Sequence, residues 1–177
     1  ALARKGNPGI RVYLYETWHG LDVAEGWLQR IDSDLSKYWQ DRIIGPAEAG
    51  GRSGEVFVIP GGQAMAAVAR AAEAGELAGL TSREDLFRRD AEGAVDPIHI
   101  NDIGAYVVAL THLAVIFHRS PVGVPHQLMH GDGTPAIALQ PETARRVQTI
   151  VRDVVAGLPQ TGVAAAILSI FGPRNRP

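Results

Sequence analysis

The chain has 177 residues, of which 46% are hydrophobic and 20% charged, so it is long enough for one domain with a substantial core and has globular composition. The net charge is −2, Lys and Arg are spread along the sequence, and no apolar run reaches the roughly 18 residues of a membrane helix, so we expect neither nucleic acid nor a membrane as partner. The absence of cysteine excludes disulfides, thiolate metal sites and a cysteine nucleophile, and nothing in the sequence assigns a compartment.

The first half of the chain alternates between stretches typical of strands and stretches typical of helices. Residues Ile10–Trp18 are rich in β-branched and aromatic side chains and follow Asn-Pro-Gly, which predicts a strand. Residues Leu21–Ile44 repeat apolar side chains at helical spacing. After a Gly- and Pro-containing loop at Gly45–Gly54, residues Glu55–Gly62 form a short apolar run typical of a buried strand, and Gln63–Ala74 return to helical composition. This order predicts a parallel sheet with helices on its faces.

The second half of the chain is mainly helical in pattern. Residues Ala78–Ile98 are polar and irregular, with one short helix expected near Arg83–Arg88, whereas Asp102–His118 is almost wholly apolar and predicts a buried helix. Residues 119–135 are typical of a loop, and Pro141 opens an amphipathic helix that Gly157 and Pro159 close. For the last segment, residues 162–177, helix and strand both stay open. We interpret residues 1–177 as a single α/β domain.

Two strands alone would leave both edges of a parallel sheet unpaired. We therefore expect that the sheet is completed either by a segment that precedes this chain or by a second chain. The first residues, ALARKGNPG, are typical of the end of a helix and the turn after it, which favours a preceding segment. The chain would then be the C-terminal portion of a larger α/β domain.

The stretch DPIHINDIGAY, residues Asp96–Tyr106, places a histidine three residues after an aspartate and just before the apolar helix. One interpretation is a catalytic pair, because an imidazole can take and return a proton at neutral pH while a carboxylate fixes its tautomer. The other is a polar helix cap formed by Asn101 or Asp102. Ligands bind beyond the carboxyl ends of parallel strands, where we expect three stretches to meet: Glu16–Trp18, Pro60–Gly62 and Asp96–His99.

The same stretch resembles the last conserved block of the SGNH (GDSL-type) hydrolases, which runs Asp-x-x-His, then x-Asn, then a Gly at the opening of the C-terminal helix. The resemblance implies that His99 is the general base, that Asp96 orients it, and that Asn101 is the matched residue near the substrate. It also implies a three-layer, flavodoxin-like α/β fold and a serine esterase that acts on small or carbohydrate esters. It extends over Ile10–His118, but only the eleven-residue block is specific.

The chain departs from the family pattern at several points. Pro97 stands where the family often has a small residue, and Ile100 where it has Pro; neither change removes a functional group. The family's Gly-Asp-Ser nucleophile block and the Gly and Asn of its oxyanion hole are absent, so the nucleophile is expected outside this chain. None of the serines present is assigned this role, namely Ser33, Ser36, Ser53, Ser82, Ser120 and Ser169.

Other interpretations use the same residues differently. Glu16 and Trp18 are candidates for substrate contact at the end of the first strand, although a Trp in this position also suits simple packing. A non-catalytic α/β binding or interaction module with a vestigial Asp96–His99 pair is the alternative function. A metal-dependent hydrolase using His99, His126 and His130 is a third, but Pro and Gly around the last two argue against the helix that their spacing needs. We therefore predict no metal and no other cofactor.

Overall fold

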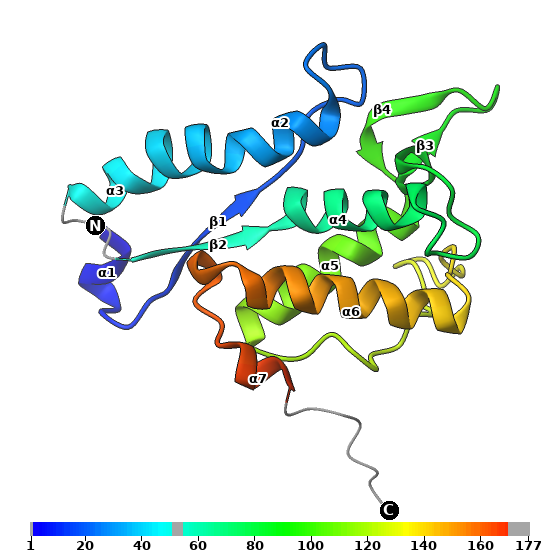
Figure 1. Cartoon of the computed structure of the whole chain (residues 1–177). Coiled ribbons are helices and arrows are strands. Elements are labelled where there is room, and N and C mark those ends of the chain that lie inside the picture. The colour runs from blue at the N-terminus through cyan, green and yellow to red at the C-terminus, as the bar shows by residue number, and fades with distance from the viewer. Residues whose placement is uncertain (1, 51–54, 170–177) are drawn as a thin grey trace, which may run out of the picture.

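The structure is a computed structural model that describes residues 2–50 and 55–169; residues 170–177 of the segment left open above lie outside this range. It is a mixed α/β arrangement in which one small parallel sheet and one hairpin are combined with helices (Figure 1). In chain order the elements are α1 (Leu2–Gly6), β1 (Val12–Glu16), α2 (Trp27–Asp34), the π-helical η1 (Leu35–Ile44), α3 (Gly45–Ala49), β2 (Val56–Pro60), α4 (Gly61–Glu73), η2 (Arg83–Leu86), β3 (Phe87–Arg89), β4 (Val95–Ile100), α5 (Asp102–Phe117), α6 (Pro141–Gly157), η3 (Pro159–Thr161) and α7 (Ala165–Ser169).

The two predicted strands pair with each other in parallel, from Val12 opposite Val56 to Glu16 opposite Pro60. In the described part of the chain, β1 has no other strand beside it. Helix η1 contacts β1 and helix α5 contacts β2, and Figure 1 shows them on opposite sides of the pair. The carboxyl ends of both strands therefore lie together at one edge of the sheet, which we call the rim and define as residues Glu16–Leu21 and Pro60–Gln63.

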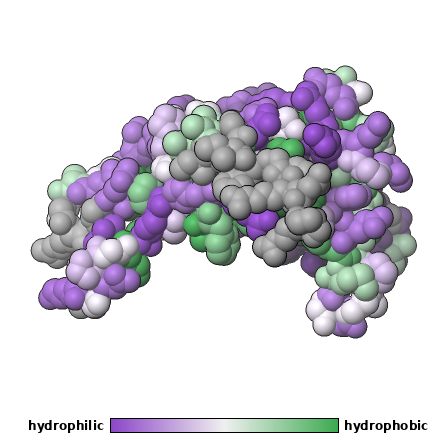
Figure 2. Space-filling model, turned by 90° about the horizontal axis from the view of Figure 1, so that it is seen from below, coloured by the Kyte–Doolittle hydropathy of each residue, from purple (hydrophilic) through white to green (hydrophobic). Residues whose placement is uncertain are grey.

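Helix α4 forms the centre of the core. It continues directly from β2 and contacts α2, α5 and α6 (Figure 1). Its many alanines let these helices approach closely, and larger side chains fill the remaining space, among them Met65, Trp27, Phe87, Val107 and Val147, each at most 1% exposed. Viewed from below, the described surface is largely hydrophilic with smaller hydrophobic patches (Figure 2). None of the described helices is both long and apolar enough to cross a membrane.

The predicted first helix differs from the observed one at both ends. It begins at Trp27 and not at Leu21, because residues 20–26 form two turns that end at Gly26, whose φ of 90° breaks helical geometry. It also continues beyond Ile44, since Gly45–Ala49 form α3, with a proline in the first turn where its missing N–H costs nothing. The prediction of a loop over Gly45–Ala49 was therefore wrong.

The second half contains a hairpin that the pattern did not predict. The short helix expected near Arg83 is η2, but β3 and β4 follow it and form an antiparallel pair, so Asp96 and His99 lie within a strand and not in a free loop. Only two residue pairs define the ladder, and the register shifts between them. Residues 96–99 form a bulge opposite β3, which hides the alternation typical of a strand. The predicted helices at Asp102 and Pro141 are confirmed as α5 and α6.

Candidate functional site

Asp96 and His99 form a hydrogen-bonded pair on β4. Asp96 Oδ2 lies 2.8 Å from His99 Nδ1, and Asp96 Oδ1 accepts hydrogen bonds from the main-chain N–H groups of Ile98 and His99, each at 2.9 Å. Both carboxylate oxygens are therefore used within one turn of chain. The His99 side chain is 68% exposed, so most of the ring is open to solvent. This is an imidazole oriented by a carboxylate and accessible to a solvent-borne group.

The main-chain N–H groups also set the charge state of Asp96. The hydrogen bonds from His99 N–H and Ile98 N–H, followed by the one from the His99 ring, lower the pKa of Asp96 to about 2. Asp96 is consequently ionised at neutral pH and also at mildly acidic pH. A permanent carboxylate at Nδ1 favours the tautomer with the proton on Nδ1 and leaves Nε2 free to accept one.

The predicted meeting of the strand ends with the Asp-His segment is confirmed. Trp18 Nε1 donates to the carbonyl oxygen of Ile98 at 3.0 Å, and Leu21 N–H donates to the carbonyl oxygen of Pro97 at 2.8 Å. The exit of β1 is thereby attached to β4. Trp18 itself is half-buried and packs against the core, and its indole N–H joins the two segments. Contact of its ring with a substrate stays a prediction.

Glu16 lies below the exposed surface of the rim. Its side chain is 0% exposed, and Oε2 accepts a hydrogen bond from the main-chain N–H of Gln63 in the first turn of α4, at 3.1 Å. Burial raises the pKa of Glu16 to about 7, although hydrogen bonds from Gln63 and Gly62 lower it in part. In this arrangement Glu16 links β1 to α4, while substrate contact by Glu16 stays a prediction that would require it to become exposed.

Both the oxygen and the nitrogen of the Asn101 carboxamide form hydrogen bonds with main-chain groups. The oxygen accepts from the N–H groups of Ile103 and Gly104, which caps α5, and the nitrogen donates to the carbonyls of Asp85 and Phe87. The helix-cap interpretation is therefore confirmed for Asn101. The cap fixes the start of α5 directly after the Asp-His segment, and so holds β4 and α5 in a defined relation.

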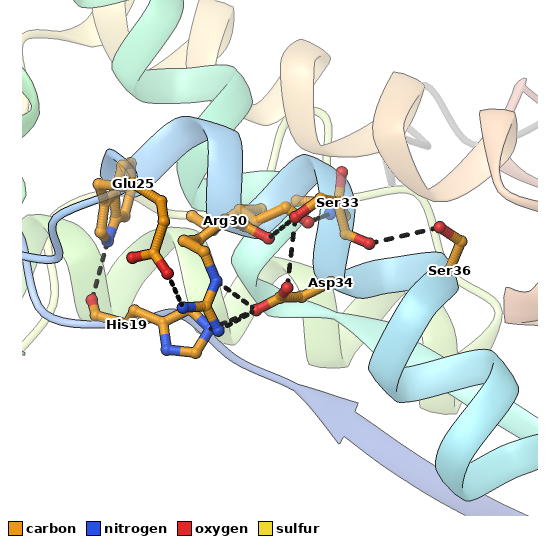
Figure 3. A network of polar contacts seen from close by, with 9 residues as sticks. His19, Glu25, Arg30, Ser33, Asp34 and Ser36 are labelled. Atoms are coloured by element: carbon orange, nitrogen blue, oxygen red, sulfur yellow. Dashed lines mark hydrogen bonds and ion pairs between the residues drawn. The ribbon is translucent and has the colours of Figure 1, made fainter.

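A second imidazole-carboxylate pair stands on the rim and was not identified from the sequence. His19 Nε2 lies 2.6 Å from Asp34 Oδ2, which also accepts from Arg30 Nε and Nη2 (Figure 3). Asp34 is 4% exposed. Burial raises its pKa, but the hydrogen bonds from Arg30 and His19 outweigh burial, so the net pKa is lowered. The sequence did contain one signal, since Asp34 lies three residues after Ile31 on the buried face of α2.

The remaining candidate groups do not join the Asp96–His99 pair. In the described part of the chain no three His, Cys, Asp or Glu side chains cluster as a metal site would require, and His130 Nε2 lies 3.3 Å from Asp102 Oδ2 instead. Ser33 and Ser36 each donate to the main-chain carbonyl three residues earlier, Ser82 caps η2, and Ser120 is buried and accepts from Val122 N–H. Ser53 and the Ser169 side chain lie outside the described residues.

Hollows formed by described residues border these elements. One of about 270 Å³ lies beside the pair and is lined by Leu21, Asp22, Glu84, Val95 and Pro97. A larger one of about 630 Å³ lies at the opposite end of the parallel strands, between η1, α3 and η3. Since parallel sheets bind ligands at the carboxyl ends of their strands, we give the smaller hollow the greater weight.

Comparison with known proteins does not assign the chain to a family. No protein-family model, no curated protein and no solved structure matches the chain.

Proposed function

We propose that this chain carries the base-bearing part of an SGNH-type serine esterase that acts on small or carbohydrate esters. The observation that supports the proposal most directly is the 2.8 Å contact between His99 Nδ1 and Asp96 Oδ2 at the carboxyl end of the parallel strands. A catalytic base must be oriented by a second group and must present its other nitrogen to the reacting hydroxyl. His99 meets both conditions, because Asp96 holds Nδ1 and the ring is mostly exposed.

In this function each residue has one role. His99 Nε2 takes the proton of the serine hydroxyl as its oxygen attacks the ester carbonyl, and returns that proton to the leaving alkoxide. Asp96 stays ionised throughout and stabilises the imidazolium between these two steps. Water then repeats the sequence on the acyl-enzyme, with His99 again as base.

The serine and the oxyanion donors would come from outside this chain, on strands that extend the parallel sheet into a three-layer, flavodoxin-like fold. The exposure of β1 supports this part of the proposal. Residues Val12–Tyr15 are all half-buried, whereas Val58–Pro60 at the end of β2 are buried. A strand beside β1, supplied by a preceding segment or by a second chain, would pair with its open main-chain edge and pack its own side chains against these.

A non-catalytic α/β binding module is the alternative, and one observation favours it. Asp96 Oδ1 accepts two main-chain N–H groups, which is the geometry of a turn stabilised by an aspartate side chain. Such a turn is stable without any reaction at His99. Only a measurement of turnover separates the two functions.

The test uses the intact protein that contains this chain and measures hydrolysis of p-nitrophenyl acetate together with labelling by a fluorophosphonate, which reacts with activated serines. We expect His99→Ala to lower turnover by at least 100-fold, the usual contribution of a general base. The matched control is His130→Ala, since His130 is also an exposed histidine beside a carboxylate. It should retain the activity of the wild type.

The labelled residue decides the location of the nucleophile. A labelled serine outside residues 1–177, whose reaction requires His99, supports the esterase. Absence of labelling would overturn the serine esterase, and turnover that is the same in His99→Ala and the wild type would favour the binding module in its place.

A further inference from the structure

The Asp96–His99 pair is held through two consecutive peptide groups, each of which has a partner on both sides. In the Pro97–Ile98 peptide, the carbonyl accepts from Leu21 N–H at 2.8 Å and the N–H donates to Asp96 Oδ1 at 2.9 Å. In the Ile98–His99 peptide, the carbonyl accepts from Trp18 Nε1 at 3.0 Å and the N–H donates to the same oxygen at 2.9 Å. The rim therefore holds the carbonyl side of both groups, and Asp96 the N–H side.

The planarity of the peptide bond connects the two sides. A carbonyl and the following N–H lie in one plane and point in opposite directions, so fixing the direction of the carbonyl fixes the direction of the N–H. A hydrogen bond to the carbonyl also polarises the group and strengthens the donor at its other end. Trp18 and Leu21 thus direct two N–H groups at the Asp96 carboxylate without contacting it.

The hairpin does not provide this support. The β3–β4 ladder pairs Phe87 with Ile100 and Arg89 with Val95, and residues 96–99 form the bulge between these two pairs. In the described part of the chain, the hydrogen bonds that reach the carbonyls of Pro97 and Ile98 come from the rim. Without them, Asp96 alone would hold the two peptide planes, through their N–H groups.

The rim segment is itself fixed on its other side. The carbonyl of His19 accepts from Trp27 Nε1 at 3.0 Å, and the His19 ring is bonded to Asp34 on α2 (Figure 3). Trp27 is 1% exposed and belongs to the core. The residue that follows Trp18 is therefore attached to α2 through both its carbonyl and its ring.

We propose that Trp18 is a positioning residue for the Asp96–His99 pair, acting through the Ile98–His99 peptide plane, with Leu21 N–H as its counterpart at the Pro97–Ile98 plane. The catalytic meaning of this role rests on the proposed esterase function. The geometric role does not, because it concerns only the direction of two N–H groups toward Asp96.

The experiment compares Trp18→Phe with Trp39→Phe in the intact protein and follows the Asp96 carboxyl carbon by NMR as a function of pH. Phenylalanine keeps an aromatic ring but lacks the indole N–H. Trp39 is the matched control, because it is half-buried on η1 and, within the described residues, its indole makes no hydrogen bond to the Asp-His segment. We expect the pKa of Asp96 to rise from about 2 toward its ordinary value near 3.8 in Trp18→Phe and to stay unchanged in Trp39→Phe.

A measurement on the wild type guards against a variant that fails to fold. Scalar coupling across a hydrogen bond, between Trp18 ¹⁵Nε1 and the Ile98 carbonyl carbon, should be detectable, as should coupling between Leu21 ¹⁵N and the Pro97 carbonyl carbon. Absence of both couplings overturns the proposal, and so does a folded Trp18→Phe protein in which Asp96 titrates as in the wild type.

Ester turnover then separates this role from the proposed function. If the pKa of Asp96 rises in Trp18→Phe while turnover does not depend on His99, the positioning role stands and the esterase fails. If turnover requires His99 while the pKa of Asp96 is the same in Trp18→Phe and the wild type, the esterase stands and the positioning role fails.

Discussion

At the scale of single residues, Glu16 is the most unusual group in the structure, because a glutamate is fully buried at the end of a strand. The N–H groups in the first turn of α4 compensate it in part, since they point toward the carboxylate and carry the positive end of the helix dipole. They do not offset the whole cost of burial, so the pKa of Glu16 is raised to about 7. The ionised form is thus disfavoured in the fold, which makes stability depend on pH.

We predict that the wild type loses stability relative to Glu16→Gln as the pH rises from 4.5 to 7, where stability is the free energy of unfolding. In this window the carboxyl group is protonated in the folded state but ionised in the unfolded chain, whose pKa is near 4.5. The folded state therefore binds more protons, and its stability decreases by at most about 1.4 kcal/mol for each unit of rising pH. The difference should become constant above pH 7, where both states are ionised.

Urea unfolding of both proteins at several pH values measures this difference. Glu92→Gln provides the control, because Glu92 is exposed in the turn between β3 and β4. A difference between wild type and Glu16→Gln that does not change from pH 4.5 to 7.5 would show that Glu16 ionises normally in the fold.

At the scale of elements, the junction between β2 and α4 determines how closely the rim can pack. Pro60 ends the strand, and two glycines begin the helix directly. A Cβ atom at Gly62 would lie 2.3 Å from Glu16 Oε1 and 2.4 Å from the carbonyl oxygen of Thr17, and one at Gly61 would lie 2.4 Å from the Tyr15 ring. Glycine is therefore needed here for space between main chains and not for an unusual φ.

We predict that Gly62→Ala destabilises the protein by about 1–3 kcal/mol, the usual cost of overpacking, because the Thr17 carbonyl belongs to the main chain and cannot rotate away. Gly157→Ala is the matched control, since it is also a helical glycine but has nothing within 4 Å of the added Cβ. It should be neutral or stabilising by up to about 1 kcal/mol. Thermal and urea unfolding of both variants check this; equal stability of the two would contradict the close approach.

The elements also show what the sequence could predict. Strands β1 and β2 and helix α5 follow from apolar runs, and helix α6 follows from amphipathic spacing between Pro141 and Gly157; both are local signals. The β3–β4 hairpin could not be predicted, because β3 has three residues and a bulge removes the alternation from β4. The Asp96–His99 contact spans three residues and was visible in the spacing, whereas the bond from Trp18 to Ile98 spans 80 residues and depends on the fold alone.

At the scale of the whole molecule, the parallel pair is the feature that most needs a partner. A two-stranded sheet is marginal by itself, and here helices α4, α5 and η1 provide packing that isolated strands would lack. They leave the outer edge of β1 without a neighbouring strand in the described part of the chain. The side chains of β1 are half-buried along both faces as far as Tyr15, as expected of an edge that another strand would cover.

We predict that in the intact protein all five amides of β1 are protected from hydrogen exchange. Successive N–H groups of a strand point to opposite sides, so β2 protects only alternate amides among Val12–Glu16, and the others need a strand on the open edge. Residue-resolved exchange by NMR distinguishes the two sets, and the amides that face β2 serve as an internal control. Rapid exchange confined to the alternate, outward amides would show that β1 is a free edge. A serine nucleophile could then not reach His99 from a strand beside β1, and the esterase would need another source for it.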